Sequence, residues 1–158
     1  MIKLIIFDLD GVLVDAKEIH YQALNKALSN IDKKYVINRE EHISTYDGNT
    51  SVTKLNLLSK EKGLPYELHD KIWEDKQNIT LQMIGDLDVD ERLVEVLKKL
   101  KEEGYILCCA TNSIRKSAKL QLIRRGFLEH LDFMYSNQDV VNPKPASEIY
   151  LRCIIKAG

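Results

Sequence analysis

The chain has 158 residues, of which 44% are hydrophobic and 30% are charged. This composition is typical of a globular protein, and it excludes a disordered or membrane-embedded chain. The formal net charge is -1, and no concentrated basic face is evident, so we expect neither nucleic acid nor a membrane as a partner.

An apolar strand is predicted at the start of the chain. Leu4 to Phe7 is a continuous apolar run of the kind found in a parallel sheet that is covered on both faces. The acids and the glycine of Asp8-Leu9-Asp10-Gly11 follow directly and predict a turn at the carboxyl end of this strand. The apolar run is too short for a signal peptide or a membrane span, so we expect a cytoplasmic protein.

The cysteine content fits the same compartment. Cys108, Cys109 and Cys153 are an odd set without the spacing of metal ligands. We therefore expect three reduced, buried and inert thiols.

The segment 15–85 is predicted to be helical, without a strand. Apolar spacing predicts a helix from Ala16 to Leu28, with Asp15 as its N-cap. Further helices are predicted over Glu40–Tyr46, around Leu55–Leu58 and over Tyr66–Met83. No internal repeat interrupts this block.

Strands and helices alternate after residue 85. The predicted elements are a helix from the capping residue Asp90 to Gly104, a strand over Tyr105–Ala110, a helix over Ser117–Arg125, a strand over Phe133–Tyr135 and a helix over Ser147–Lys156. This alternation on both sides of a helical block indicates an α/β core whose strands are parallel, because crossovers are right-handed. We expect an α/β core of residues 1–14 and 86–158, with a helical cap inserted at 15–85.

Each predicted strand ends at, or leads into, residues suited to phosphate chemistry. Asp8 and Asp10 follow the first strand, Thr111 follows the second, and Lys144 comes after the third. Ligands bind at the carboxyl ends of parallel strands, so we expect these side chains to surround one anion. A carboxylate can act as a nucleophile and a second one as a general acid/base, and their oxygens suit Mg²⁺.

These residues resemble three signatures of the haloacid dehalogenase superfamily. Asp8-Leu9-Asp10-Gly11-Val12 resembles the first, Ala110-Thr111-Asn112 the second, and the segment from Lys144 to Tyr150 the third. The position of the helical insertion resembles the cap of the phosphoglycolate phosphatase and β-phosphoglucomutase branch. The resemblance implies a Rossmann-like core.

The resemblance also implies a role for each residue. Asp8 would be the nucleophile that forms an aspartyl phosphate, and Asp10 would be the general acid/base. The Asp8 side chain and the Asp10 backbone carbonyl would bind Mg²⁺. Thr111 and Lys144 would hold the phosphoryl group, with Asn112 beside it.

The cap gives weaker indications of the substrate. His20 is a candidate at the mouth of the site, although a single histidine is about twice as often packed or solvated. The cap loop at Gly48-Asn49-Thr50-Ser51 lacks the arginine that the mutase branch uses for a sugar phosphate. The loop therefore favours a phosphatase for a small phosphorylated metabolite over a β-phosphoglucomutase-like enzyme.

One signature of the superfamily is not found before Gly158. The resemblance implies an acidic pair after one more strand, which would complete the Mg²⁺ site. That strand would lie beside Leu4–Phe7, which without it would form an open sheet edge. The alternatives are a fragment of a longer enzyme, a dimer or other partner that covers the edge, and a degenerate, non-catalytic binding protein. We favour the fragment.

A signalling receiver domain is a further alternative, because it gathers acids, a hydroxyl residue and a lysine at strand ends. Such a domain needs its phosphoaccepting Asp after a later strand, and none follows Tyr105–Ala110. The helical insertion is also foreign to that fold.

Overall fold

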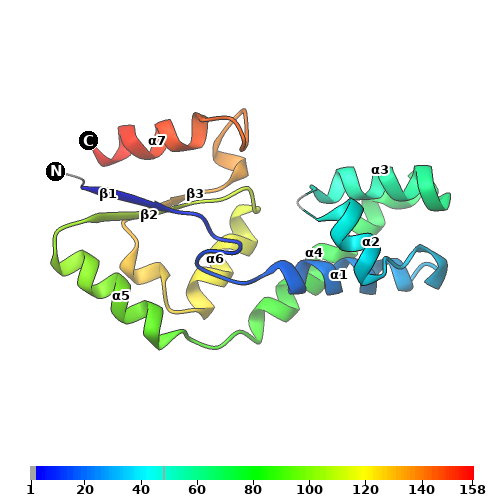
Figure 1. The fold of residues 1–158 in the computed structure, drawn as a ribbon, viewed down its shortest axis with the longest axis horizontal. Coiled ribbons are helices and arrows are strands. Elements are labelled where there is room, and N and C mark those ends of the chain that lie inside the picture. The colour runs from blue at the N-terminus through cyan, green and yellow to red at the C-terminus, as the bar shows by residue number, and fades with distance from the viewer. Residues whose placement is uncertain (1–2, 48) are drawn as a thin grey trace. The chain divides into compact units, whose positions relative to one another are not determined.

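The computed structural model describes residues 3–47 and 49–158. The chain divides into two compact units (Figure 1). The α/β unit contains the chain up to Lys17 together with Ile84–Gly158, and the helical unit is Glu18–Met83.

A parallel sheet forms the centre of the α/β unit. Its strands are β1 (Leu4–Phe7), β2 (Ile106–Ala110) and β3 (Phe133–Tyr135), in the order β1-β2-β3. In the register, Phe7 of β1 pairs with Cys109, and Tyr135 of β3 pairs with Ala110. The carboxyl ends of the strands therefore lie at one edge of the sheet, and the predicted α/β class with parallel strands is confirmed.

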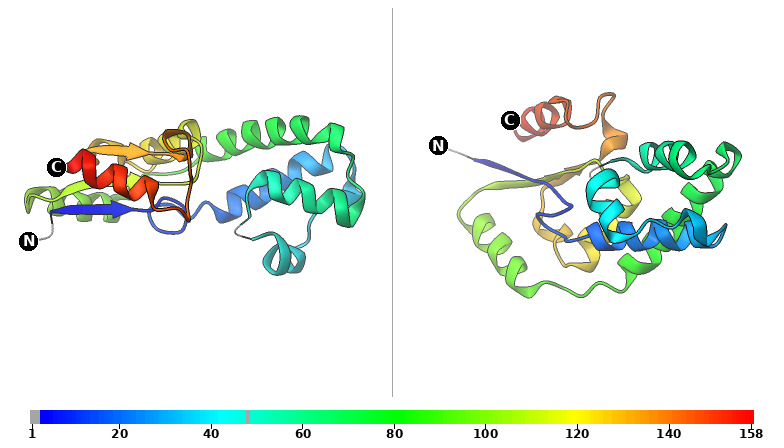
Figure 2. Two further views of the ribbon diagram at one scale, coloured as in Figure 1. Left: turned by 90° about the horizontal axis from the view of Figure 1, so that it is seen from above. Right: turned by 45° about the vertical axis from the view of Figure 1, so that its right-hand side comes forward.

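Helices cover both faces of this sheet. Helices α5 (Glu91–Glu102) and α6 (Arg115–Arg124) lie on one face, and α7 (Glu148–Ala157) lies on the other (Figures 1 and 2). Side chains alternate along a strand, so Leu107 and Cys109 pack towards α5 and α6, whereas Cys108 packs against α7.

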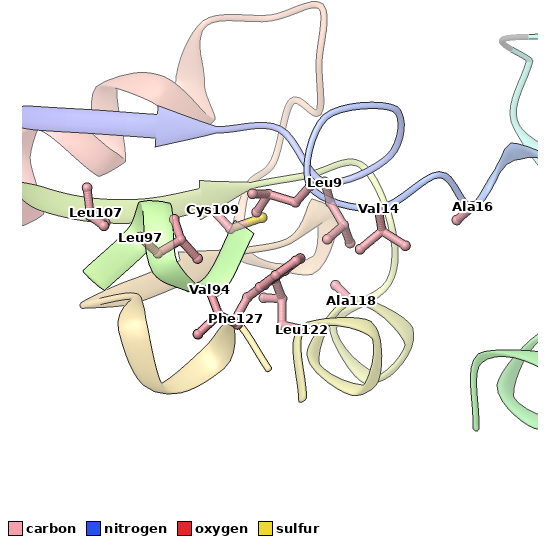
Figure 3. Packing of buried hydrophobic residues seen from close by; sticks show 11 residues of the cluster. Leu9, Val14, Ala16, Val94, Leu97, Leu107, Cys109, Ala118, Leu122 and Phe127 are labelled. Carbon is pink, nitrogen blue, oxygen red and sulfur yellow. The ribbon is translucent and has the colours of Figure 1, made fainter. Parts of the chain in front are cut away.

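The buried side chains between the sheet and helices α5 and α6 form a larger core than those between the sheet and α7. Figure 3 shows side chains from β2, α5 and α6 directed into it, together with Leu9 and Val14 from the loop after β1. Its largest fully buried side chains include Phe127 and Leu97. Because Leu9 and Val14 belong to the loop that carries Asp8 and Asp10, the core holds this loop against the end of the sheet.

Two of the predicted helices of the helical unit differ from the observed ones. Its helices are α1 (Lys17–Ser29), α2 (Arg39–Glu41), α3 (Ser51–Lys62) and α4 (His69–Gly85), of which α1 and α4 cross the unit boundary. The predicted helix over Tyr66–Met83 is divided, because a 3₁₀ turn at Tyr66–Leu68 follows Pro65 and α4 begins only at His69. The predicted helix over Glu40–Tyr46 continues from α2 as a π-helix, His42–Tyr46.

Helix starts in the α/β unit agree closely with the prediction. Asp90 caps α5 as expected, since its carboxylate accepts a hydrogen bond of 3.1 Å from the backbone N–H of Leu93. Helix α6 begins at Arg115, two residues before the predicted Ser117.

Strand β1 lies at an edge of the three-stranded sheet that the described residues form. All four of its side chains are partly exposed. The further strand expected beside β1, and the alternative of a partner that covers this edge, stay predictions.

Within the described residues, no helix is both long enough and apolar enough to cross a membrane. The cytoplasmic location stays a prediction.

Candidate functional site

A compact loop after β1 fixes the two acids of the site. Gly11 has a left-handed backbone, with φ of +84°, a conformation that glycine adopts without strain. This turn lets the Gly11 N–H donate to the Val14 carbonyl at 2.8 Å, while the Leu9 carbonyl accepts from the Leu13 N–H at 3.0 Å. Asp8 and Asp10 therefore project from a tightly hydrogen-bonded backbone.

Lys144 contacts the first of these acids directly. Its Nζ lies 2.9 Å from Asp8 Oδ1, and it also donates a hydrogen bond of 2.6 Å to the carbonyl of Ala110, the last residue of β2. The lysine side chain is 14% exposed and the Asp8 side chain is 47% exposed. The cation is thus enclosed by the site, while the carboxylate remains accessible to a ligand.

The side chain of Asn112 clamps the backbone of Lys144. Its amide nitrogen donates to the Lys144 carbonyl at 3.0 Å, and its amide oxygen accepts from the Lys144 N–H at 3.0 Å. The peptide bond from Lys144 to Pro145 is cis. The two hydrogen bonds of Asn112 hold the loop that follows β3 and carries Lys144, here called the lysine loop, against the end of β2.

Glu148 orders the other side of the lysine loop. Its carboxylate accepts hydrogen bonds from the backbone N–H groups of Val141, at 3.0 Å, and Asn142, at 2.8 Å. These backbone donors lower the pKa of Glu148 below its usual value, because they stabilise the charged carboxylate.

Thr111 lies directly after β2 and is 1% exposed. Its N–H donates to the carbonyl of Tyr135 at 3.0 Å, and its hydroxyl oxygen accepts from the Ser113 N–H at 3.0 Å. A hydroxyl can accept and donate at the same time, so the Thr111 hydroxyl is fixed in place with a proton to donate.

Ser113 is a site residue that we did not predict from the sequence. Its hydroxyl donates a hydrogen bond of 2.6 Å to Asp10 Oδ2. The only sequence signal for Ser113 was its position directly after Asn112, the last residue of the segment that resembles the second signature.

The cysteines are buried and unbridged, as predicted. Burial, together with the nearby Asp8 carboxylate, raises the pKa of Cys109 to about 12. The thiol therefore stays neutral at physiological pH, because a thiolate here would be desolvated and would face a like charge.

Two further candidate residues were predicted in the cap. His20 lies on α1 in the helical unit, and Gly48 lies outside the described residues. Their roles towards a substrate stay predictions.

The donor set at the end of β1 fits Mg²⁺. Among the residues described, no group of three or more His, Cys, Asp or Glu side chains is placed to hold a metal ion. Mg²⁺ does not require such a cage, since one or two carboxylates usually bind it together with water and substrate phosphates. The accessible Asp8 carboxylate and the Asp10 backbone carbonyl offer oxygen ligands of this kind.

Comparison with known proteins identifies related chains. The family model of haloacid dehalogenase-like hydrolases matches residues 5–158. A phosphorylated carbohydrates phosphatase of Thermotoga maritima is 24% identical over 147 residues, which are 93% of this chain and 67% of the relative.

Solved structures share the fold. A predicted phosphoglycolate phosphatase of Haemophilus somnus superposes with a TM-score of 0.86 at 24% identity, over 99% of this chain and 72% of the other. A β-phosphoglucomutase of Clostridium difficile gives a TM-score of 0.76 at 23% identity, over 98% of this chain and 70% of the other. This chain therefore spans about 70% of the length of these relatives.

Proposed function

Since the chain belongs to the haloacid dehalogenase-like hydrolases, we propose that it hydrolyses the phosphate ester of a small metabolite through a phosphoenzyme on Asp8. The observation that carries the proposal is the 2.9 Å contact between Lys144 and Asp8. An anionic nucleophile repels an anionic phosphate, and a fixed cation at this position offsets that repulsion.

The relatives support a phosphorylated small molecule as substrate. The Thermotoga relative is named a phosphatase of phosphorylated carbohydrates, and a structural neighbour is described as a predicted phosphoglycolate phosphatase. Both kinds of molecule carry a phosphate ester on a small carbon skeleton.

In the first step, an Asp8 carboxylate oxygen attacks phosphorus, and the bond from phosphorus to the ester oxygen breaks. Asp10, in its acid form, gives its proton to the leaving oxygen, so that an alcohol departs rather than an alkoxide. Lys144 and the Thr111 hydroxyl stabilise the charge on the transferring phosphoryl group.

In the second step, water attacks the phosphorus atom of the phosphoenzyme. The Asp10 carboxylate accepts a proton from this water, and the bond between phosphorus and Asp8 breaks to release inorganic phosphate. Asp10 is then an acid again, ready for the next substrate.

The Asp8 carboxylate and the Asp10 carbonyl would hold Mg²⁺. The bound ion would neutralise charge that develops on the phosphoryl oxygens. We therefore propose that the reaction requires Mg²⁺.

Hydrolysis of p-nitrophenyl phosphate in the presence of Mg²⁺ tests the proposal. Asp8→Asn keeps the shape of the side chain but removes the nucleophile, so we expect a loss of more than about 10,000-fold in rate. Asp70→Asn, at an exposed position of α4, is the matched control and should retain the rate of the unmodified chain. Equal rates for Asp8→Asn and the unmodified chain would contradict the proposal.

A sugar-phosphate mutase is the second candidate, because a β-phosphoglucomutase shares the fold. Incubation with β-glucose 1-phosphate distinguishes the two reactions. A phosphatase releases inorganic phosphate and glucose, whereas a mutase yields glucose 6-phosphate without net release of phosphate.

A further inference from the structure

Ser113 and Asp10 form a hydrogen bond across the site. The Ser113 hydroxyl donates to Asp10 Oδ2 at 2.6 Å, although the two residues are 103 positions apart in the chain. A hydroxyl bond to a carboxylate at this distance is among the stronger hydrogen bonds in proteins.

The backbone segments that carry Ser113 and Asp10 are each held by their own hydrogen bonds. The Ser113 N–H donates to the Thr111 hydroxyl at 3.0 Å, and the Ser113 carbonyl accepts from the Asn137 N–H at 3.5 Å. On the other side, the loop of Asp10 is closed by the bond from Gly11 to Val14. The bond between the side chains therefore orients one carboxyl group between two anchored segments.

We propose that Ser113 is a positioning residue that holds the Asp10 carboxyl in the orientation needed for proton transfer. The inference rests on the function proposed above, in which Asp10 exchanges a proton with the ester oxygen and then with water. A serine hydroxyl both donates and accepts, so Ser113 can stay bonded to Asp10 in either protonation state. A general acid that is free to rotate would spend less time aligned with the leaving oxygen.

Substrates with different leaving groups separate this role from a merely structural one. Nitrophenolate departs without a proton, whereas the alkoxide of β-glycerophosphate needs one. In Ser113→Ala we expect kcat for β-glycerophosphate to fall about 10- to 100-fold, with KM nearly unchanged. Formation of the phosphoenzyme from p-nitrophenyl phosphate, followed as a nitrophenolate burst, should stay within about threefold, because only proton transfer is affected.

Ser113→Thr retains a hydroxyl and should restore most of the β-glycerophosphate rate. Ser29→Ala, at an exposed position at the end of α1, is the control for the loss of a serine hydroxyl elsewhere. It should match the unmodified chain with both substrates.

A double-mutant cycle with Asp10→Asn tests whether Ser113 acts through Asp10. We expect Ser113→Ala to have no further effect on the rate once Asp10 is replaced. An equal loss in both backgrounds, or an equal loss in kcat for β-glycerophosphate and in the nitrophenolate burst, would overturn the inference. Asp8→Asn is assayed in parallel, and activity that survives this change would defeat the proposed function rather than the role of Ser113.

Crystal structures of the unmodified chain and of Ser113→Ala give a readout that does not depend on turnover. We expect one Asp10 rotamer in the unmodified chain, and a different rotamer or several rotamers in the variant. The same single rotamer in both crystals would show that Ser113 does not position Asp10.

Discussion

Lys144 and Asp8 are separated by 136 positions in the chain, yet their charged groups lie 2.9 Å apart. The lysine reaches the acid from the loop after β3, while β2 lies between the two parent strands and supplies the Ala110 carbonyl as a second acceptor. The pair thus joins segments at the carboxyl ends of all three strands at the place where we expect phosphate to bind.

Removal of this cation should slow the proposed reaction strongly. In Lys144→Gln we expect p-nitrophenyl phosphate hydrolysis to fall about 100- to 1,000-fold, because the charge on the phosphoryl group loses its fixed partner. Lys156→Gln, at an exposed position of α7, should retain activity. A comparable loss in both variants would point to a general effect of lysine charge rather than to the site.

Loss of the Asn112 clamp should affect activity more than stability. Asn112→Ala removes two hydrogen bonds to the Lys144 backbone, and a displaced lysine is expected to lower kcat about 10- to 100-fold. The free energy of unfolding should change by no more than about 1–3 kcal/mol, since a typical hydrogen bond contributes about 0.5–1.5 kcal/mol. Urea unfolding and the phosphatase assay measure the two effects, with Asn78→Ala at an exposed position of α4 as control. Unchanged kcat in Asn112→Ala would show that the Asn112 hydrogen bonds are not needed to position Lys144 for the reaction.

Acid should loosen the lysine loop through Glu148. Backbone bonds from Val141 and Asn142 lower the pKa of this carboxyl from its usual 4.5. Because the pKa is lower in the folded chain than in the unfolded one, the stabilisation is present above the unfolded-state pKa. It is lost as the pH falls through the lowered folded-state pKa.

Amide NMR shifts of Val141 and Asn142 report this transition. We expect both resonances to move together as the pH falls below the usual pKa of glutamate, and to stay nearly constant in Glu148→Gln, which does not titrate. Identical titration curves in the two proteins would mean that another group controls the loop.

Chelation should abolish the proposed hydrolysis. With EDTA we expect no measurable release of nitrophenolate from p-nitrophenyl phosphate, and addition of excess Mg²⁺ should restore the rate, because the metal offsets phosphoryl charge. Calorimetric titration with Mg²⁺ provides a second measurement, in which Asp8→Asn should bind more weakly. Full activity in EDTA would rule out the metal requirement.

Truncation of a buried side chain in the core between the sheet and helices α5 and α6 should destabilise the fold. Leu97 is fully buried on α5, and its neighbour Val96 is 45% exposed. Leu97→Ala is expected to lower the free energy of unfolding by about 2–5 kcal/mol, whereas Val96→Ala should change it by less than about 1 kcal/mol. Urea unfolding of both variants gives the comparison, and equal effects would contradict the assigned packing.

Local patterns in the sequence were sufficient to predict the strands and α-helices of the α/β unit, but not its 3₁₀ turns at Leu128–His130 and Asn137–Asp139. The apolar runs at Leu4–Phe7 and Phe133–Tyr135 are strands with the predicted bounds. Asp90 caps its helix as predicted, because a cap depends on residues only three positions apart. The breaks in the helical unit were missed, because an apolar stripe has nearly the same spacing in an α-helix, a 3₁₀ turn and a π-helix over one turn.

The sequence also predicted only part of the candidate site. That Asp8, Thr111 and Lys144 belong to one edge of the sheet could be inferred from the sequence, because parallel strands bring their carboxyl ends together. Only the tertiary structure decided that Ser113 bonds to Asp10, that Asn112 holds the Lys144 backbone and that Glu148 binds two loop amides. These bonds depend on the paths of loops between elements, and loop paths follow no residue period from which they could be predicted.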